Sequence, residues 1–176
     1  GEGVVSSVEE VKAKIKEDAI SPSKREEDAG YDLYSNIEPR FLDSVAIYEQ
    51  FLEKGTVNKI RTGIASSMSN KYFLSVKSER SSVAKLGINV LAGVIDSGYH
   101  GEIMVMVVPL VKDILITSEV DEVEEFVEII HYPYNKAVAQ GVLLPVPDVI
   151  VEEVTYDELL SKKTERGVGG FGSTEK

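Results

Sequence analysis

Short apolar runs, each ended within a few residues by glycine, proline, asparagine or serine, limit the folds open to this chain more than any other feature. These runs are rich in β-branched and aromatic residues and occupy residues 45–48, 72–76, 103–108 and 142–146. Such residues fit the pleated surface of a strand, and the residues between them form turns. We therefore expect an all-β domain of the sandwich, jelly-roll or barrel class. Residues 103–108 are continuously apolar, which predicts a strand buried on both faces.

The N-terminal segment allows two interpretations. Residues 11–16 alternate apolar and charged side chains, as a half-buried strand does. Ser7 and Glu10 have the spacing of a capping box, which would instead open a short helix at Val8. We favour the strand.

The stretch from residue 110 to 133 carries an acidic run interleaved with apolar side chains. Its acidic residues include Glu119, Asp121, Glu122, Glu124, Glu125 and Glu128. A solvated hairpin, or a short helix with one apolar face, is the ordinary structure for such a pattern, and a surface for a protein partner is the alternative. We therefore predict a β-domain over residues 1–160 with an acidic insert near 110–133. Residues 156–160 predict a helical turn, and residues 161–176 a flexible glycine-rich tail.

Composition excludes several classes of function. The net charge is −11, from 30 acidic and 19 basic residues, which argues against nonspecific binding to nucleic acid or to an anionic membrane. The chain has no cysteine and two histidines, so disulfides and thiolate sites are excluded and a histidine-rich metal site is not expected. No segment has the roughly 18 apolar residues of a membrane span, and the N-terminus lacks the layout of a secretory signal. We expect a soluble, cytoplasmic protein.

Three segments carry side chains suited to chemistry. Asp96 lies near the tip of a predicted hairpin over residues 93–101, where a carboxylate acts as a general base or simply forms a turn. Arg80, Ser81 and Ser82 offer donors to phosphate, or form a surface loop. Residues 166–174 combine four glycines with an arginine and an aromatic ring, which suits a loop that approaches phosphates closely, or a disordered tail.

Together these segments resemble the trimeric dUTPase family, which has five ordered motifs. Residues 29–33 are similar to the first motif and residues 80–84 to the second. Residues 92–103, with Gly-Val-Ile-Asp and a tyrosine three positions later, match the third motif most specifically. Residues 135–140 resemble the fourth motif and residues 166–174 the fifth, while residues 62–65 resemble a strand of the family. The resemblance extends from about residue 11 to residue 174.

The resemblance implies a jelly-roll-like dUTPase fold and a homotrimer with active sites at the subunit interfaces. It implies hydrolysis of dUTP to dUMP and pyrophosphate by attack of water on the α-phosphate. This reaction removes dUTP and supplies dUMP for thymidylate synthesis. Mg²⁺ is the implied cofactor, bound through the substrate phosphates and water without direct protein ligands.

The same resemblance assigns roles to individual residues. Asp96 is the implied general base, and the other implied catalytic residues are Asp32, Gln140 and Arg166. Tyr99 packs beneath the deoxyribose and excludes a ribose 2′-hydroxyl. The glycine-rich tail closes as a lid over the substrate. The remaining implied contacts are to the phosphates (Arg80, Ser81, Ser82), to the uracil edge (Asn89, Ala92, Gly93, Val94, Ile95) and from the lid (Phe171, Gly172, Ser173, Thr174).

Two departures from the family pattern bear on this site. Residues 134–137 replace the usual Gly-Asp-Arg-Ile of the fourth motif, and Glu79 brings a carboxylate next to Arg80. One alternative is therefore a noncatalytic, regulatory protein-binding module on a dUTPase scaffold, with the acidic insert as its contact surface. The other alternative is the related dCTP deaminase, which shares the fold but uses a catalytic glutamate near the hairpin and lacks the glycine-rich tail.

Overall fold

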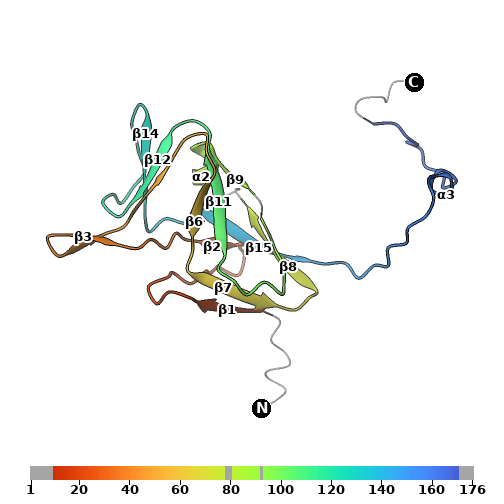
Figure 1. Ribbon diagram of the computed structural model, residues 1–176, viewed down its shortest axis with the longest axis horizontal. Helices are drawn as coiled ribbons and strands as arrows, with labels where there is room; N and C mark the ends of the chain where they lie inside the picture. The colour runs from red at the N-terminus through yellow and green to blue at the C-terminus, as the bar shows by residue number, and fades with distance from the viewer. Residues whose placement is uncertain (1–9, 78–80, 92, 171–176) are drawn as a thin grey trace, which may run out of the picture. The chain divides into compact units, whose positions relative to one another are not determined.

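The computed structural model describes residues 10–77, 81–91 and 93–170, and strands dominate it (Figure 1). The chain divides after Val146 into two units, the β-body up to that residue and the C-terminal segment from Pro147. The C-terminal segment contains the short helix α3 (Tyr156–Leu160). The described elements of the β-body are β1 (Glu10–Lys14), β2 (Tyr31–Leu33), β3 (Arg40–Leu42), β4 (Val45–Ile47), β5 (Glu49–Leu52), β6 (Asn58–Arg61), β7 (Ile64–Met68), β8 (Tyr72–Lys77), α2 (Ser81–Lys85), β9 (Ile88–Leu91), β10 (Val94–Ile95), β11 (Met104–Pro109), β12 (Asp113–Thr117), β13 (Glu124–Glu125), β14 (Ile129–Pro133) and β15 (Ala139–Pro145).

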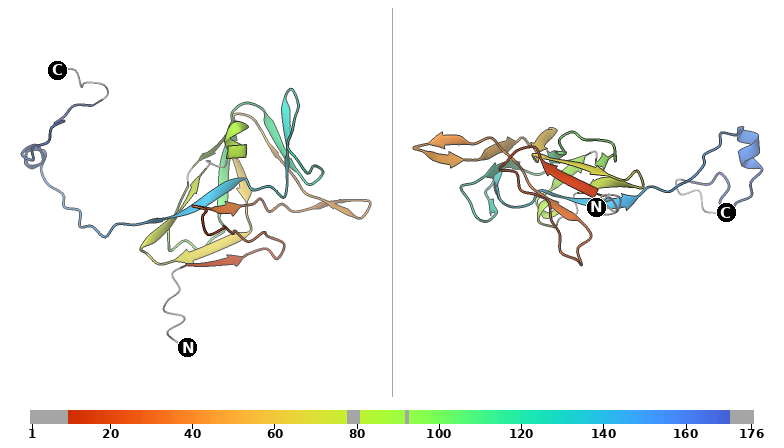
Figure 2. Two further views of the ribbon diagram at one scale, coloured as in Figure 1. Left: turned by 180° about the vertical axis from the view of Figure 1, so that it is seen from behind. Right: turned by 90° about the horizontal axis from the view of Figure 1, so that it is seen from below.

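The β-body is a set of small sheets, which confirms the all-β prediction. One four-stranded sheet has the order β10–β8–β15–β2, and a second has the order β13–β14–β12–β5. A three-stranded sheet, β6–β11–β9, and the pairs β1–β7 and β3–β4 accompany them. Figures 1 and 2 show β12 and β14 at one end of the β-body and the β1–β7 pair at the other. Among the described strands, only β12 and β14 pair in parallel.

The core lies where these sheets face one another. On β11, Val105 and Val107 are 0% and 1% exposed, whereas the residues that alternate with them are half-buried. The prediction that both faces of this strand are fully buried is therefore wrong, because only one face enters the core. The larger buried cluster consists of Leu33, Leu52, Ile60, Val76, Val83, Leu86, Ile88, Val105, Val107, Ile114, Ile116, Ile130, Tyr132, Val138 and Ala139. A smaller one consists of Ala19, Ile64, Leu74 and Ile103.

Most local predictions agree with the structure. β1, β4, β8 and β15 confirm the strands predicted from residues 11, 45, 72 and 142 onward. The strand interpretation of residues 11–16 is the right one, although Ser7 and Val8 lie outside the described residues. α3 confirms the helical turn, and the Thr155 hydroxyl caps it by accepting a hydrogen bond from the Glu158 N–H at 3.2 Å.

The stretch from residue 110 to 133 contributes two strands to the core. Ile114 and Ile116 of β12 and Ile130 and Tyr132 of β14 are at most 1% exposed. β13 and β14 form a short antiparallel hairpin, so the hairpin interpretation is confirmed and the helical one is wrong. The acidic residues lie between the two core strands, over residues 119–128, and we call this segment the acidic loop.

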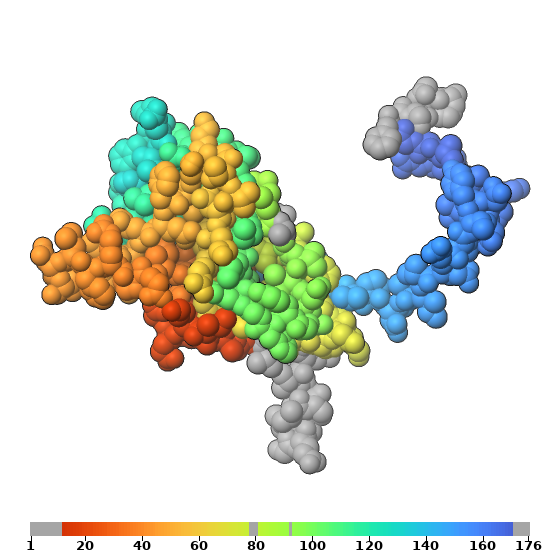
Figure 3. All heavy atoms as spheres, viewed as in Figure 1, coloured from red at the N-terminus to blue at the C-terminus, as the bar shows by residue number. Residues whose placement is uncertain are grey.

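The β3–β4 hairpin stands out from the β-body (Figure 3). Its turn residues Asp43 and Ser44 have φ angles of 49° and 68°, the left-handed conformation that closes a two-residue hairpin. Among the residues that the structure describes, no helix is long and apolar enough to cross a membrane.

Candidate active site

Strand β15 brings together residues from three distant parts of the sequence. It lies between β2 and β8, and its register places Gln140 directly opposite Asp32 on one side and Lys77 on the other. Residues directly opposite in an antiparallel pair point to the same face of the sheet. The buried residues that alternate with them, such as Ala139 and Val76, point to the core. Asp32, Gln140 and Lys77 therefore form a row on the outer face of this sheet.

A cavity of about 670 Å³ opens beside this row. It is lined by Asp32, Gln140 and the loop that precedes β2. This loop places Ser23 next to Asp32, on the side away from Gln140, because the Asp32 N–H donates to the Ser23 carbonyl at 3.2 Å. The lining residues are Ser23, Lys24, Arg25, Glu27, Asp28, Ala29, Gly30, Asp32 and Gln140. The structure thus brings together Asp32 and Gln140, two of the residues to which the family resemblance gives a catalytic role.

Two of the charged side chains that line this cavity, Arg25 and Asp28, form an ion pair with each other. The Arg25 guanidinium donates two hydrogen bonds of 3.0 Å to the Asp28 carboxylate, and the Arg25 main-chain N–H donates a third. These hydrogen bonds hold the pKa of Asp28 below its ordinary value. Asp28 therefore stays ionised near neutral pH and is engaged with Arg25.

The segment 93–96 departs from the predicted hairpin. The strands that pair around it are β9 and β11, whereas β10 leaves this pair and joins the edge of β8. Gly93 makes the change of direction with a φ of 133°, and its carbonyl accepts the Val76 N–H at 2.7 Å. A Cβ at Gly93 would lie 2.7 Å from the Val76 carbonyl oxygen, so only glycine fits this close approach.

Asp96 and Tyr99 lie in the turn after β10. The Tyr99 N–H donates to the Asp96 carbonyl at 3.1 Å, and the Tyr99 hydroxyl donates to the Glu102 carbonyl at 2.8 Å. The Asp96 side chain is exposed and has no hydrogen-bond or ion-pair partner among the described residues. Tyr99 is 44% exposed. The turn thus presents a free carboxylate and an aromatic ring three residues apart.

The Glu102 carboxylate anchors this turn to the β-body. It is 7% exposed and accepts hydrogen bonds from Arg61 at 2.7 and 3.0 Å and from the Gly63 N–H at 2.8 Å. Burial opposes ionisation of Glu102, but these hydrogen bonds and the charge of Arg61 outweigh it and lower the pKa of Glu102. The Thr62 hydroxyl also donates to the Ile103 carbonyl at 2.6 Å.

Asp96 and Gln140 are far apart within one chain. Ile95 pairs with Leu74 on β8, whereas Gln140 pairs with Lys77, three residues further along the same strand. At about 3.3 Å per residue and about 4.8 Å between strands, Ile95 and Gln140 are about 14 Å apart. Asp96 lies beyond Ile95, on the side away from Lys77. One chain therefore does not place its own Asp96 beside its own Gln140.

The other predicted residues are placed as follows. Ser81 and Ser82 begin α2, and Ser82 Oγ is buried without a hydrogen-bond partner in the described part of the chain. Val94 is exposed, and Ile95 packs against the core. Asn89 is exposed on β9, which belongs to a different sheet. Six of the predicted substrate-binding residues lie outside the described residues: Arg80, Ala92, Phe171, Gly172, Ser173 and Thr174.

Arg166 belongs to the C-terminal segment. Its Nε donates to the Gly169 carbonyl, and the Gly169 N–H donates back to the Arg166 carbonyl at 3.0 Å. Gly167 has a φ of 56° and its N–H donates to the Thr164 hydroxyl at 2.9 Å. Residues 164–169 therefore form a compact turn that holds the arginine.

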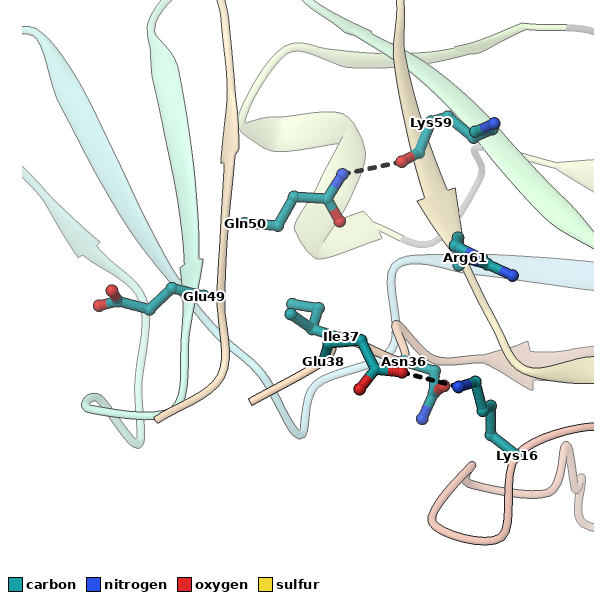
Figure 4. A pocket seen from close by; sticks show the side chains of 8 residues that line it. All are labelled: Lys16, Asn36, Ile37, Glu38, Glu49, Gln50, Lys59 and Arg61. Atoms are coloured by element: carbon teal, nitrogen blue, oxygen red, sulfur yellow. Dashed lines mark hydrogen bonds and ion pairs between the residues drawn. The ribbon is translucent and has the colours of Figure 1, made fainter. Parts of the chain in front are cut away.

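A second cavity, of about 200 Å³, lies between β5 and β6 (Figure 4). The Gln50 side-chain amide donates to the Lys59 carbonyl at 2.8 Å across it. Four of its charged side chains are already paired: Lys16 with Glu38 at 2.7 Å, Arg61 with Glu102, and Glu49 with Arg40 at 2.9 Å. The cavity contains none of the predicted site residues.

Sequence analysis did not single out Lys77, Lys24 or Glu102. Lys77 follows a predicted strand, but its place beside Gln140 depends on the register between strands 63 residues apart, which no local pattern gives. The signal for Glu102 was present, because a carboxylate directly before a continuously apolar strand needs a partner when it is buried.

The comparisons with known proteins agree on one family. A family model described as dUTPase matches residues 16–120. The deoxyuridine 5′-triphosphate nucleotidohydrolase of Nautilia profundicola is 31% identical over 166 residues, which cover 93% of this chain and 96% of the relative. The enzyme of the same name from Clostridioides difficile is 32% identical over 164 residues, which cover 92% and 94% of the two chains.

Solved structures share the fold. The Staphylococcus bacteriophage 80alpha dUTPase with dUpNHpp has a TM-score of 0.68 at 21% identity, over 95% of this chain and 98% of that one. A mutant dUTPase from phage phi11 of S. aureus, which coordinates a structural Mg(II) ion, has a TM-score of 0.62 at 21% identity, over 85% and 98%. The predicted dUTPase fold is thereby confirmed.

We expect Glu102→Gln to lower the free energy of unfolding by about 1–3 kcal/mol near neutral pH, because hydrogen bonds from Arg61 and Gly63 lose their charged acceptor. The folded pKa of Glu102 is depressed, so its contribution is fully present above the unfolded pKa, about 4.3, and is lost as the pH falls through the folded pKa. The difference between wild type and variant should therefore shrink in acid below about pH 4. Urea denaturation at several pH values measures it.

Glu38→Gln is the matched control. Glu38 pairs with Lys16 at 2.7 Å, but its side chain is 77% exposed, so the change should stay within about 0.5 kcal/mol. Equal stability of Glu102→Gln and wild type near neutral pH would contradict the anchoring role.

Proposed function

This chain belongs to the dUTPase family, and on that premise we propose that it hydrolyses dUTP to dUMP and pyrophosphate by attack of water on the α-phosphate. The observation that carries the proposal is the row on β2, β15 and β8, where Asp32 and Gln140 lie directly opposite each other beside a cavity of about 670 Å³. We further propose that the enzyme acts in the cytoplasm.

The turn after β10 supplies the base in this proposal. The exposed Asp96 carboxylate orients a water molecule and accepts its proton, while the exposed Tyr99 ring packs against the deoxyribose. The anchoring of this turn through Glu102 supports the assignment, because a general base must be held within hydrogen-bond reach of the proton that it accepts. Gln140 and Asp32 orient the α-phosphate and its surroundings. The tail from residue 161 closes as the lid, with Arg166 at the γ-phosphate and Phe171 on the uracil.

The charged side chains near this cavity fit a Mg²⁺ ion that is bound mainly by the substrate. Among the described residues, no three His, Asp or Glu side chains gather into a cage for a metal. Asp28 is engaged with Arg25, while Asp32 lines the cavity with hard oxygen atoms that suit Mg²⁺ or its bound water. When bound, the ion would neutralise part of the triphosphate charge.

We propose a homotrimer in which different chains complete each site. The separation of about 14 Å between the Ile95 and Gln140 positions supports this arrangement. The C-terminal segment supports it as well, because Val149, Ile150 and Val151 are 66%, 98% and 88% exposed, and an apolar run of this kind is typical of a surface that another chain covers.

Asp96→Asn should lower kcat by roughly 10²–10⁴-fold, because the amide cannot accept the proton of the attacking water. The measurement is pyrophosphate release from dUTP with Mg²⁺, with dTTP, dCTP and UTP as competing substrates that should remain uncleaved. Asp43→Asn is the matched control, since Asp43 is also an exposed turn carboxylate but lies in the β3–β4 hairpin. A well-folded wild type that leaves dUTP intact would refute the proposal, and release of ammonia from dCTP would favour a deaminase.

Co-refolding of Asp96→Asn with Gln140→Ala should restore part of the activity that each variant lacks. If Asp96 and Gln140 of one site come from different chains, mixed trimers contain some sites with both native residues. Co-refolding of Asp96→Asn with the double variant is the control, because none of its sites contains a native Asp96. Equal activity in both mixtures would contradict sites shared between chains.

The acidic loop supports a second function, which could accompany catalysis. We propose that it binds a basic protein surface, because Phe126 and Val127 are 48% and 89% exposed among its carboxylates. Deletion of residues 113–130 would remove β12 and the start of β14, so point variants are the better test.

Replacement of Phe126 and Val127 by serine should abolish capture of such a partner in a pull-down, while dUTP hydrolysis stays within about twofold of wild type, because the loop lies outside the row of Asp32 and Gln140. The Phe41→Ser variant, which alters another exposed aromatic ring, is the control. Capture that is unchanged by the loop variant would count against the loop as the contact surface.

A further inference from the structure

The row on the outer face of the β10–β8–β15–β2 sheet contains a lysine to which the family resemblance gives no role. Lys77 lies directly opposite Gln140, so their Cβ atoms are about 5 Å apart on the same face. The Lys77 side chain is half-buried, and its ammonium has no hydrogen-bond or ion-pair partner in the part of the chain that the structure describes. A half-buried cation of this kind is suited to an anionic ligand.

A second lysine flanks the row at its other end. Lys24 lines the cavity next to Ser23, whose carbonyl accepts the Asp32 N–H. Its ammonium lies 3.4 Å from the Arg25 carbonyl oxygen and 5.8 Å from the centre of the Tyr31 ring. Neither contact is an ion pair. The Asp28 carboxylate, which is engaged with Arg25, also feels the charge of Lys24, which helps to lower the pKa of Asp28. Lys24 is therefore the cavity-lining cation that remains available for an anion.

The order across the sheet is Lys24 beside Ser23, then Asp32, Gln140 and Lys77. The four neighbouring positions of this row cover about 14 Å at about 4.8 Å per strand. The flexible four-carbon stem of a lysine at either end is long enough to bring its ammonium to a ligand bound over the row. This spacing suits an extended polyphosphate better than a single phosphate, because two point charges can each contact a different phosphate group.

We propose that Lys24 and Lys77 bind the β- and γ-phosphates of the substrate triphosphate and so position its α-phosphate beside Gln140. This proposal rests on the proposed function and extends its phosphate site by two residues.

The test measures binding, so it does not depend on turnover. Wild type, Lys77→Gln and Lys24→Gln are titrated by calorimetry with α,β-imido-dUTP and Mg²⁺, and separately with dUMP. Each variant should bind the imido triphosphate about tenfold or more weakly, the loss expected for one charge-assisted hydrogen bond. The affinity for dUMP should stay within about twofold, because dUMP has no β- or γ-phosphate. Lys77→Arg, which keeps the charge, should recover most of the lost affinity.

Lys71→Gln is the matched control, since Lys71 is an exposed lysine just before the other end of β8. Unchanged affinity for the imido triphosphate in Lys77→Gln or Lys24→Gln overturns the role of that residue. An equal loss for dUMP and the triphosphate also overturns it, because that result indicates a structural defect. A wild type that binds the imido triphosphate but does not cleave dUTP would refute the proposed function and leave this phosphate site standing.

Discussion

The register of β15 between β2 and β8 is the constraint on which the rest of the site depends. It sends Ala139 to the core and Gln140 to the outer face, beside Asp32 and Lys77. A slip of one residue would exchange these faces, burying the glutamine and exposing the core residues. The free energy that holds the polar row in place therefore comes mainly from the apolar side of the same three strands, where burial of each large aliphatic side chain is worth about 1.5–3 kcal/mol.

A separate set of backbone and side-chain interactions fixes the turn that carries Asp96 and Tyr99. Gly93 allows β10 to leave the β9–β11 pair and join β8, and Glu102 ties the far end of the turn to the segment between β6 and β7. Both ends of the turn are thus attached to different sheets. The fold separates the two groups of candidate site residues, with about 14 Å between the Ile95 and Gln140 positions. This separation gives the proposed homotrimer a physical reason, because residues that cannot meet within one chain can meet between chains.

Most of the strands and the order of the motifs could be predicted from the sequence, because both depend on local composition. Alternation at residues 11–16 and apolar runs near residues 72 and 142 predicted strands that the structure has. Pairing was harder to predict. Nothing local indicates that β10 pairs with β8 or that β12 pairs in parallel with β14, since these choices depend on packing across the core. Lys77 was missed for the same reason, as its neighbour Gln140 is distant in sequence.

The net charge of the chain limits how a phosphate site on this protein can attract its ligand. A protein with a net charge of −11 repels a triphosphate at long range, so attraction must come from groups close to the ligand, where screening by salt and distance is weakest. Around the cavity, Arg25 is engaged with Asp28, which leaves Lys24 and the main-chain or hydroxyl donors as the lining groups for phosphate. In the proposed site, cations at both ends of the row would give a local positive field that favours a polyanion lying along the row. Nonspecific polyanions, which would need a broad basic face, gain little from so small a site.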